Sequence, residues 1–322
     1  MSFSLWRRKE PAEAAAGAAA AAPATAAPRA PAPVVPTAAP VEPKPTDEQI
    51  DCFGMTHVGK VRKTNQDHFL ICSLHRQVVL HGTSLTDLGS LPINRERMAF
   101  LAMVADGVGS GARGGESSRH AVEWLTRYVA EAMQTYYVTD ATADSFVQAL
   151  SEAGYRAHAS MQELARADAD LEGMATTLTM LLFVWPWVNV LQVGDSRYYR
   201  LENGELIQVT RDQTMAEALV EQGVFSSEEA GRTRWANVLA SSLGGKQTAP
   251  VVSRLPSTLG AIHLLCSDGL TKHVSNERIK ERLATMTSAR QVCENLINDA
   301  LEGGGSDNVT VVVGRVVPKP AA

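Results

Sequence analysis

Helix-like and strand-like segments form separate blocks in this sequence, and that separation restricts the possible fold more than any other feature. Through residues 116–136 and 143–165 apolar side chains recur at intervals of three and four, as on one face of an amphipathic helix. Runs rich in apolar and β-branched residues, which are typical of strands, cover residues 98–105, 176–185, 188–193, 262–266 and 309–317. Two long helices are therefore expected between strands.

Antiparallel pairing is indicated by the segment 198–209, which is interrupted at Asn203 and Gly204, the strongest short-range signal for a β-hairpin. Helical patterns return at residues 276–284 and 289–301, and the second ends at three glycines, 303–305, a typical helix stop. Long helices kept apart from antiparallel strands predict an α+β layered domain rather than a doubly wound parallel sheet.

Residues 10–47 differ from the rest of the chain because they are almost entirely alanine and proline. Such a segment cannot bury a core; its proline spacing favours an extended polyproline spacer, and its alanine run a transient helix. The sequence therefore predicts a disordered Ala/Pro-rich tail at 1–47, one domain at 48–317 and a short C-terminal tail at 318–322. The tail is interpreted as a linker; the alternative is a docking arm that attaches through Trp6 and the basic residues 7–9.

The charge and cysteine patterns exclude several classes of function. With 30 basic and 35 acidic side chains the formal net charge is -5, and no window combines clustered Lys and Arg with aromatics, so nucleic-acid binding is not expected. The 4 cysteines lie far apart without a Cys-x-x-Cys pair and are interpreted as structural thiols. No segment approaches the ~20 apolar residues of a membrane span, and no secretory signal follows the first basic residues, so a cytoplasmic location is expected.

Four strand candidates each have an aspartate close to one end, namely Asp106, Asp195, Asp268 and Asp307. A single Asp-Gly pair after a strand is more often an ordinary turn. Four converging carboxylates, however, would repel one another strongly unless cations neutralised them. Oxygen ligands without His or Cys select hard octahedral ions such as Mg²⁺ or Mn²⁺.

A further segment, residues 54–67, combines a fixed positive charge at Arg62 with another carboxylate at Asp67. A guanidinium can hold a phosphate through paired hydrogen bonds. The alternative for Arg62 is a surface salt bridge to Asp67 or Glu48.

These motifs resemble, in their order along the chain, those of the PPM family, protein phosphatase type 2C, and those of bacterial members most closely. The resemblance covers residues 51–317 and rests on Arg62 with residues 65–67 and on residues 105–109, 176–177, 194–197, 267–269 and 306–308. It implies a four-layer α-β-β-α sandwich of two antiparallel sheets flanked by helix pairs, with the metal ions in a cleft at one edge. That architecture agrees with the α+β class expected from the segment pattern.

The resemblance also implies residue roles. Asp106 would bridge two Mn²⁺ or Mg²⁺ ions and Arg62 would hold the substrate phosphate, which makes these two the predicted catalytic residues. Asp195 matches a residue that can help to bind a third ion. The implied metal ligands are Asp67, Asp106, Gly107, Asp195, Asp268 and Asp307.

The expected reaction is hydrolysis of phosphoserine and phosphothreonine on proteins by in-line attack of a metal-bridging hydroxide, in opposition to a Ser/Thr kinase. Phosphorylated proteins and such a kinase are therefore the expected partners. The alternative is a non-catalytic module of the same fold that binds a phosphoprotein or a kinase. Lost metal carboxylates would mark such a module, whereas Asp106, Asp268 and Asp307 are all present.

Three positions depart from the family pattern. Gln66 stands where animal members have Glu, Val108 where they have a candidate general-acid His, and Gln213 where a His usually follows Asp212. None of these changes removes an implied metal ligand. The isolated histidines His57, His68, His120 and His273 have no Ser or Cys partner motif and are interpreted as structural.

Overall fold

The computed structural model describes residues 43–77, 80, 84, 96–109, 112–136 and 143–318. Residues 40–322 form one compact unit, and the fold described below belongs to it. Most of the predicted tail at 1–47, and residues 319–322 of the predicted C-terminal tail, lie outside the described residues.

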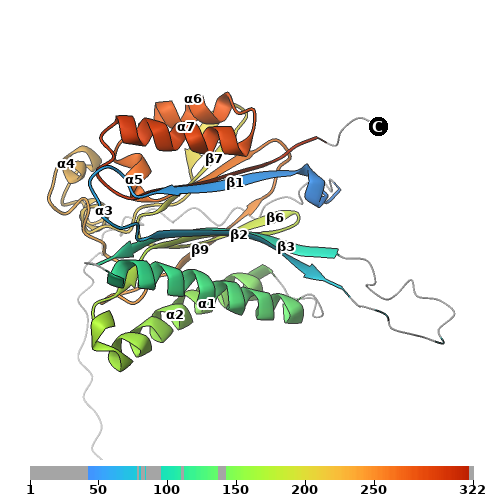
Figure 1. The fold of residues 1–322 in the computed structure, drawn as a ribbon, viewed down its shortest axis with the longest axis horizontal. Helices are drawn as coiled ribbons and strands as arrows, with labels where there is room; N and C mark the ends of the chain where they lie inside the picture. Colours follow the sequence, from blue (N-terminus) through green and yellow to red (C-terminus); the bar gives the residue numbers. More distant parts are fainter. Residues whose placement is uncertain are drawn as a thin grey trace, which may run out of the picture. The chain divides into compact units, whose positions relative to one another are not determined.

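Two antiparallel sheets form the centre of this unit (Figure 1). The first sheet has the strand order β1 (Ile50–His57), β11 (Val309–Val316), β10 (Ile262–Cys266), β7 (Arg197–Glu202) and β8 (Glu205–Gln208). The second has the order β2 (Asp67–Arg76), β3 (Glu96–Val108), β5 (Leu178–Val184), β6 (Trp187–Val193) and β9 (Val251–Pro256), with β4 (Ala175–Thr176) paired to β3.

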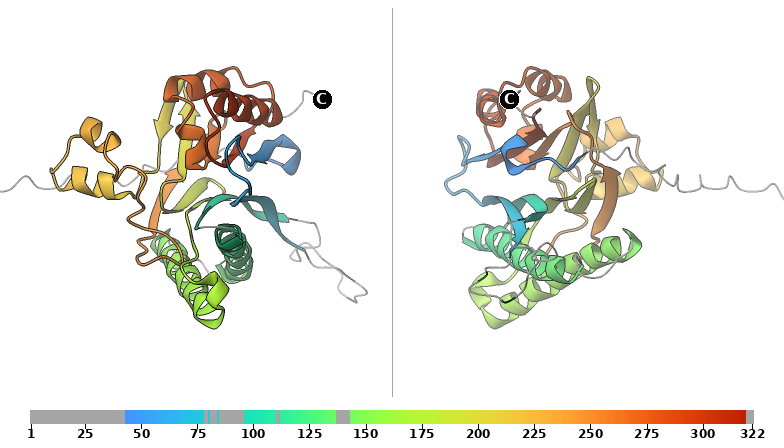
Figure 2. Two further views of the ribbon diagram at one scale, coloured as in Figure 1. Left: turned by 60° about the vertical axis from the view of Figure 1, so that its left-hand side comes forward. Right: turned by 90° about the vertical axis from the view of Figure 1, so that its right-hand side faces the viewer.

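A helix pair covers the outer face of each sheet, which confirms the expected four layers (Figure 1). Helices α1 (Ala112–Tyr136) and α2 (Ala143–Ala167) cover the second sheet, and α6 (Asn276–Ala284) and α7 (Ala289–Glu302) cover the first. The short helices α3 (Met215–Glu221) and α4 (Ser227–Gly231) lie to one side (Figure 2), and α5 (Asp268–Thr271) follows β10. None of the described helices is long and apolar enough to cross a membrane.

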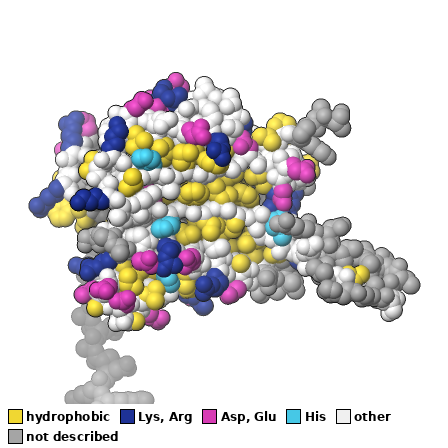
Figure 3. Space-filling view, viewed as in Figure 1, with side chains coloured by type: hydrophobic (Ala, Val, Ile, Leu, Met, Phe, Trp, Pro, Cys, Tyr) yellow, Lys and Arg dark blue, Asp and Glu magenta, His cyan; other side chains and the backbone are white. Residues whose placement is uncertain are grey.

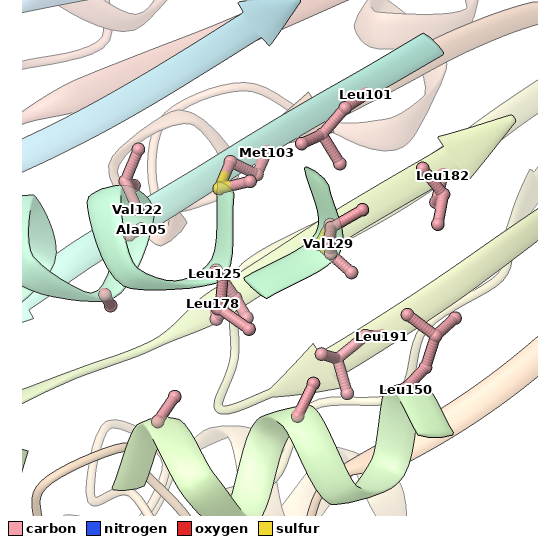
Figure 4. Packing of buried hydrophobic residues seen from close by; sticks show 14 of the residues in the cluster. Leu101, Met103, Ala105, Val122, Leu125, Val129, Leu150, Leu178, Leu182 and Leu191 are labelled. Atoms are coloured by element: carbon pink, nitrogen blue, oxygen red, sulfur yellow. The ribbon is translucent and has the colours of Figure 1, made fainter. Parts of the chain in front are cut away.

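Three buried apolar clusters hold the layers together: one under α1 and α2, one under α6 and α7, and one between the sheets. Leu125 of α1 and Leu150 of α2 point toward the sheet that carries Leu178 and Leu191 (Figure 4). Complete burial of a leucine side chain contributes roughly 1.5–3 kcal/mol. The helical periodicity seen in the sequence thus marks the helix faces that pack on the sheets.

The predicted elements are confirmed with small changes at their ends. The hairpin turns at Asn203 and Gly204, whose φ angles of 51° and 78° are the positive values that such a turn requires. The predicted strand 176–185 is divided into β4 and β5 at Thr177. The N–H of Thr177 donates to the Asp106 carbonyl oxygen, and its hydroxyl contacts the Ser196 hydroxyl.

Strands β1, β2 and β9 were not predicted from the sequence. In β1 and β2 nearly all side chains are only partly buried, because these strands form the edges of the two sheets. Hydrophobic side chains gather along that edge, while charged ones lie mainly over the helix layers (Figure 3). Gly54 in β1 leaves room for Phe69 of β2, since a Cβ there would lie 2.4 Å from the ring.

His263 makes the stability of this fold sensitive to acid. The ring is buried in the sheet interface, with Nδ1 2.8 Å from the Tyr198 hydroxyl oxygen, and burial, with a smaller effect of Arg200, lowers its pKa to about 3. An unfolded histidine takes up a proton below about pH 6.5, so between pH 6.5 and 3 the unfolded chain binds more protons and stability falls as the pH falls. We expect this group to lower the free energy of unfolding by about 2 kcal/mol between pH 7 and pH 5.

Urea denaturation of the wild type and of His263→Gln at both pH values measures this contribution. Glutamine retains a hydrogen-bonding group for Tyr198 but does not titrate. The variant should therefore lose less stability on acidification than the wild type. Equal losses in the two proteins would contradict the prediction.

Candidate metal centre

Asp67 and Asp106 lie directly opposite each other where β2 and β3 pair. Oδ2 of Asp67 accepts hydrogen bonds from Ser267 Oγ and Thr310 Oγ1, each at 2.8 Å. Oδ1 of Asp67 is buried and has no hydrogen-bond partner among the described residues. Burial raises the pKa of Asp67 to about 6, although the bonds from Ser267 and Thr310 oppose the shift.

Two threonines fix the backbone of Asp106. The carbonyl oxygen of Asp106 accepts hydrogen bonds from Thr176 Oγ1 at 2.8 Å and from the Thr177 N–H at 2.9 Å. The N–H of Asp106 donates a hydrogen bond to Thr177 Oγ1 at 3.1 Å. Burial first, and then the nearby charges of the other four predicted aspartates, raise the pKa of Asp106 well above its usual value. Asp106 is therefore at the centre of a group of five carboxylates.

The glycines after two of these aspartates are required by close backbone contacts. A Cβ on Gly107 would lie 1.9 Å from the carbonyl oxygen of Gly114 at the start of α1. A Cβ on Gly269 would lie 1.9 Å from the carbonyl oxygen of Asn308. Because real Cβ atoms do not approach so closely, these Asp-Gly pairs mark places where two backbone segments touch, which ordinary surface turns would not require.

Asp268 and Asp195 lie on the side of the group that faces α3 and α4. Oδ1 of Asp268 is buried without a hydrogen-bond partner in the described part of the chain. Burial, followed by the charge of Asp268, raises the pKa of Asp195 to about 7. A cavity of about 320 Å³ opens beside both carboxylates and is bounded on its other side by α3 and α4.

Asp307 is held by two basic side chains. Arg62 donates through Nε to Oδ1 at 2.7 Å and through Nη2 to Oδ2 at 3.0 Å, and Lys272 Nζ lies 2.8 Å from Oδ2. Burial opposes ionisation of Asp307, but the bonds from Arg62 and Lys272 outweigh it and lower its pKa. Lys272 also contacts Asp268 Oδ2 at 2.6 Å, so one ammonium joins two carboxylates.

The residues fit a pair of hard divalent cations by their chemistry. The cluster offers only oxygen donors, and two of its buried oxygens, on Asp67 and Asp268, have no hydrogen-bond donor among the described residues. Among the described residues, no three His, Cys, Asp or Glu side chains are already placed so that they could hold one metal ion together. Arg62 and Lys272 occupy both oxygens of Asp307, so a cation at Asp307 competes with these contacts. Lys272 contacts only Oδ2 of Asp268 and leaves its Oδ1 available to a cation.

A second cavity, about 70 Å³, lies between the two sheets beside Lys44 and His263. Its walls are mainly apolar, and the predicted carboxylates are absent from them. Hydrolysis of a charged substrate requires polar groups that converge on the reacting atoms. We therefore assign the functional site to the carboxylate cluster.

Comparison with known sequences decides the family. The sequence profile of the family Protein phosphatase 2C matches residues 87–302. The chain belongs to the protein phosphatase 2C family. The matched segment contains Asp106, Asp195 and Asp268.

Curated type 2C relatives come from several bacteria. The serine/threonine protein phosphatase PstP of Mycobacterium tuberculosis is 34% identical over 245 residues, which are 74% of this chain and 46% of PstP, so this chain spans just under half of that relative. The serine/threonine phosphatase stp of Listeria welshimeri is 32% identical over 70% of this chain and 88% of its own length.

Solved structures of the family share the fold. The catalytic domain of PstP in complex with 2 manganese ions is 30% identical, with a TM-score of 0.64, and the match covers 84% of this chain and 99% of that one. The Streptococcus agalactiae serine/threonine phosphatase is 25% identical, with a TM-score of 0.68, over 83% of this chain and 99% of that one.

The departures from the type 2C pattern have local explanations. Gln213 accepts the Gly194 N–H at 2.8 Å and donates to the Ala249 carbonyl at 3.0 Å, so an amide joins these segments where a histidine is customary. Gln66 Nε2 donates to the Gly109 carbonyl at 3.2 Å. Val108 is 41% exposed beside Asp106 and cannot exchange a proton.

Sequence reasoning missed four side chains that contact the site. Ser267 and Thr310 bond Asp67, Lys272 joins Asp268 to Asp307, and His273 contacts the segment before Asp307. One signal was available for Lys272, because it lies four residues after Asp268 on a helical turn. The other three histidines that were interpreted as structural also have hydrogen-bond partners. His57 accepts the Gly59 N–H, and His68 and His120 contact the hydroxyls of Ser118 and Ser160.

Proposed function

We propose that this chain hydrolyses phosphoserine and phosphothreonine on proteins with the help of two divalent cations. The observation that carries the proposal is a group of five buried or partly buried carboxylates, two of whose oxygens lack a hydrogen-bond donor in the described residues. Membership of the type 2C family and the names of the relatives support the substrate class. The PstP structure with 2 manganese ions supports Mn²⁺ as a suitable cation.

Asp67 and Asp106 lie at the paired ends of β2 and β3, whereas Asp268 begins α5 and Asp307 precedes β11. Asp106 has both the central position and a backbone fixed by Thr176 and Thr177, which suits a carboxylate shared by two ions. Asp268 and Asp307 would hold one of these ions. The complete proposed set is Asp67, Asp106, the carbonyl of Gly107, Asp268 and Asp307, with Asp195 beside a third position.

When bound, the two ions would supply Lewis acidity, lowering the pKa of a water molecule and offsetting negative charge on the phosphoryl oxygens. The protein's own part is to orient the phosphate and to keep the carboxylates fixed during the reaction. Thr310 and Ser267 hold Asp67 in place through one of its oxygens and leave the other without a hydrogen-bond donor among the described residues.

Arg62 is proposed to bind the substrate phosphate. Its side chain is 54% exposed and now pairs with Asp307. Because more than half of the Arg62 side chain is exposed, a phosphate dianion can reach the guanidinium and replace the carboxylate as its partner. The guanidinium geometry suits two parallel bonds to either group.

The reaction implies a partner, because a protein must be phosphorylated before it can be dephosphorylated. A Ser/Thr protein kinase acting on the same substrates is therefore part of this proposal, as is a cytoplasmic location shared with it. The competing function is a non-catalytic module that binds phosphoproteins. The retention of all the expected carboxylates favours the enzyme.

Removal of metal tests the proposal. We expect a phosphothreonine peptide to be hydrolysed with Mn²⁺ or Mg²⁺, not after exhaustive dialysis against EDTA, and again once Mn²⁺ is restored, because oxygen ligands hold such ions exchangeably. Phosphate release and peptide binding are measured on the same samples. Full turnover in the chelated protein would refute metal dependence, and tight peptide binding without turnover at any metal concentration would favour the non-catalytic module.

A further inference from the structure

His273 contacts the glycine-rich segment before Asp307 through both ring nitrogens. Nε2 accepts the Ser306 N–H at 2.9 Å and lies 2.9 Å from the Oγ of the same residue. A ring nitrogen that accepts an N–H carries no proton, so the proton of the neutral ring is on Nδ1. Nδ1 lies 3.0 Å from the Gly303 carbonyl oxygen and donates to it. The contacts therefore define one tautomer and one ring orientation.

The backbone that carries His273 is anchored to α5, which begins at Asp268. The N–H groups of His273 and Val274 both donate to the Leu270 carbonyl oxygen, at 3.1 and 2.9 Å. Leu270 and Val274 are buried in the cluster under α6 and α7. The ring thus projects from a firmly packed support that also carries Asp268.

The segment that His273 contacts is rich in glycine. Gly304 and Gly305 have φ angles of 132° and 55°, and successive glycines give a backbone the greatest conformational freedom. Gly305 is fixed by its bonds to Ala300 and Lys60. Ser306, the residue directly before Asp307, is exposed, and its hydrogen bonds within the described part of the chain both go to His273.

We propose that His273 is a positioning residue that fixes Asp307 relative to Asp268. The proposal rests on the proposed function, in which both aspartates bind the same ion. His273 acts through the Ser306 backbone, unlike Lys272, which contacts the two carboxylates themselves. Without the ring, the backbone before Asp307 would have to be ordered by the metal ion, and the affinity for that ion would fall.

Three variants separate positioning from a general structural role. His273→Ala removes both contacts. In His273→Gln the side-chain oxygen reaches about as far as Nε2 and can accept the Ser306 N–H. In His273→Asn the amide reaches only as far as Nδ1 and can replace the Gly303 contact alone. His120→Ala, which removes a histidine bonded to Ser160 on the neighbouring helix, is the matched control.

Mn²⁺ binding to the full-length chain, measured by calorimetry, should be about 10-fold weaker in His273→Ala, a loss typical of residues that orient metal ligands. His273→Gln should recover most of the affinity, His273→Asn should not, and His120→Ala should match the wild type. In the metal-free proteins, hydrogen exchange at residues 303–308 should be faster in His273→Ala and His273→Asn than in His273→Gln.

Unchanged Mn²⁺ affinity in His273→Ala, or an equal loss in the glutamine and asparagine variants, overturns the proposal. Faster exchange across all of the described chain would also overturn it, since that result means general destabilisation. A wild-type chain that binds no Mn²⁺ refutes both this proposal and the proposed function. A wild type that binds Mn²⁺ but hydrolyses no phosphopeptide refutes the proposed function alone.

Discussion

Replacing Asp106 with asparagine should abolish phosphopeptide hydrolysis at every substrate concentration, with kcat reduced by about 1000-fold or ~4 kcal/mol of transition-state stabilisation. Asp106 is the carboxylate on which the charges of Asp67, Asp268, Asp195 and Asp307 all act. An amide there removes the negative charge that holds two cations close together. The loss should therefore accompany weaker Mn²⁺ binding and should not be corrected by more substrate.

Arg62→Ala provides the contrast that makes this prediction specific. Arg62 is proposed to bind a phosphate that is already doubly charged before reaction, so much of its contribution is uniform binding and should appear as a KM raised about 10-fold, ~1.4 kcal/mol. Some loss of kcat is also expected, because orientation suffers. The bond from Arg62 to Asp307 offers the competing explanation, that Arg62 supports a metal ligand.

Steady-state kinetics at saturating Mn²⁺, with metal affinity measured by calorimetry, distinguish these roles. Asp170→Asn, at an exposed aspartate in the short 3-10 helix Ala169–Leu171, and Arg156→Ala, at an exposed arginine of α2, are the matched controls. If Arg62→Ala weakens Mn²⁺ binding as severely as Asp106→Asn does, Arg62 holds the site together and the phosphate assignment is wrong. If Asp106→Asn retains wild-type kcat, the central role of Asp106 is wrong.

The parts of the fold that the sequence predicts are those with strong local patterns. Helices α1 and α2 were visible because each buries one face along its length, and the hairpin because Asn203 and Gly204 adopt positive φ. Strands β1 and β2 give no such pattern, because an edge strand with partly buried side chains on both faces does not alternate cleanly.

The same distinction applies to the site. Asp106, Asp195, Asp268 and Asp307 were singled out because each lies close to the end of an apolar strand. Asp67 begins a strand that the sequence did not predict, and strand pairing brings it opposite Asp106. Their charged partners were not predictable. Arg62 pairs with Asp307, 245 residues later, whereas the sequence offered only Asp67 or Glu48 as alternatives. Side-chain partners joined by tertiary structure alone leave no local signal.

Lys272 is another side chain whose tertiary contacts the local sequence does not indicate. An Asp and a Lys four residues apart are ordinarily a solvent-exposed helical pair of small energy. Here Nζ lies 2.6 Å from Asp268 Oδ2 and 2.8 Å from Asp307 Oδ2, and only 29% of the side chain is exposed. The ammonium therefore supplies positive charge to the two carboxylates proposed to hold one metal ion.

Lys272→Met should bind Mn²⁺ about 30-fold more tightly, ~2 kcal/mol, because opposite charges in partly buried sites attract by several kcal/mol and the ion no longer has to compete with the ammonium. The metal-free variant should at the same time unfold at a lower temperature, since the two carboxylates lose the charge that offsets their repulsion. Calorimetry gives the first quantity and thermal unfolding in EDTA the second. Lys272→Arg, which keeps the charge, and Lys280→Met, an exposed lysine on α6, serve as controls.

The opposite signs of the two effects are the essential part of this prediction. A lysine that only supports the fold would lower stability when removed without tightening metal binding. A lysine that orients the ligands of the loaded site would weaken metal binding when removed, as proposed for His273. Tighter Mn²⁺ binding together with lower metal-free stability requires that Lys272 and a divalent cation neutralise the same carboxylates. Weaker binding in Lys272→Met would show instead that the ammonium and the cation act side by side.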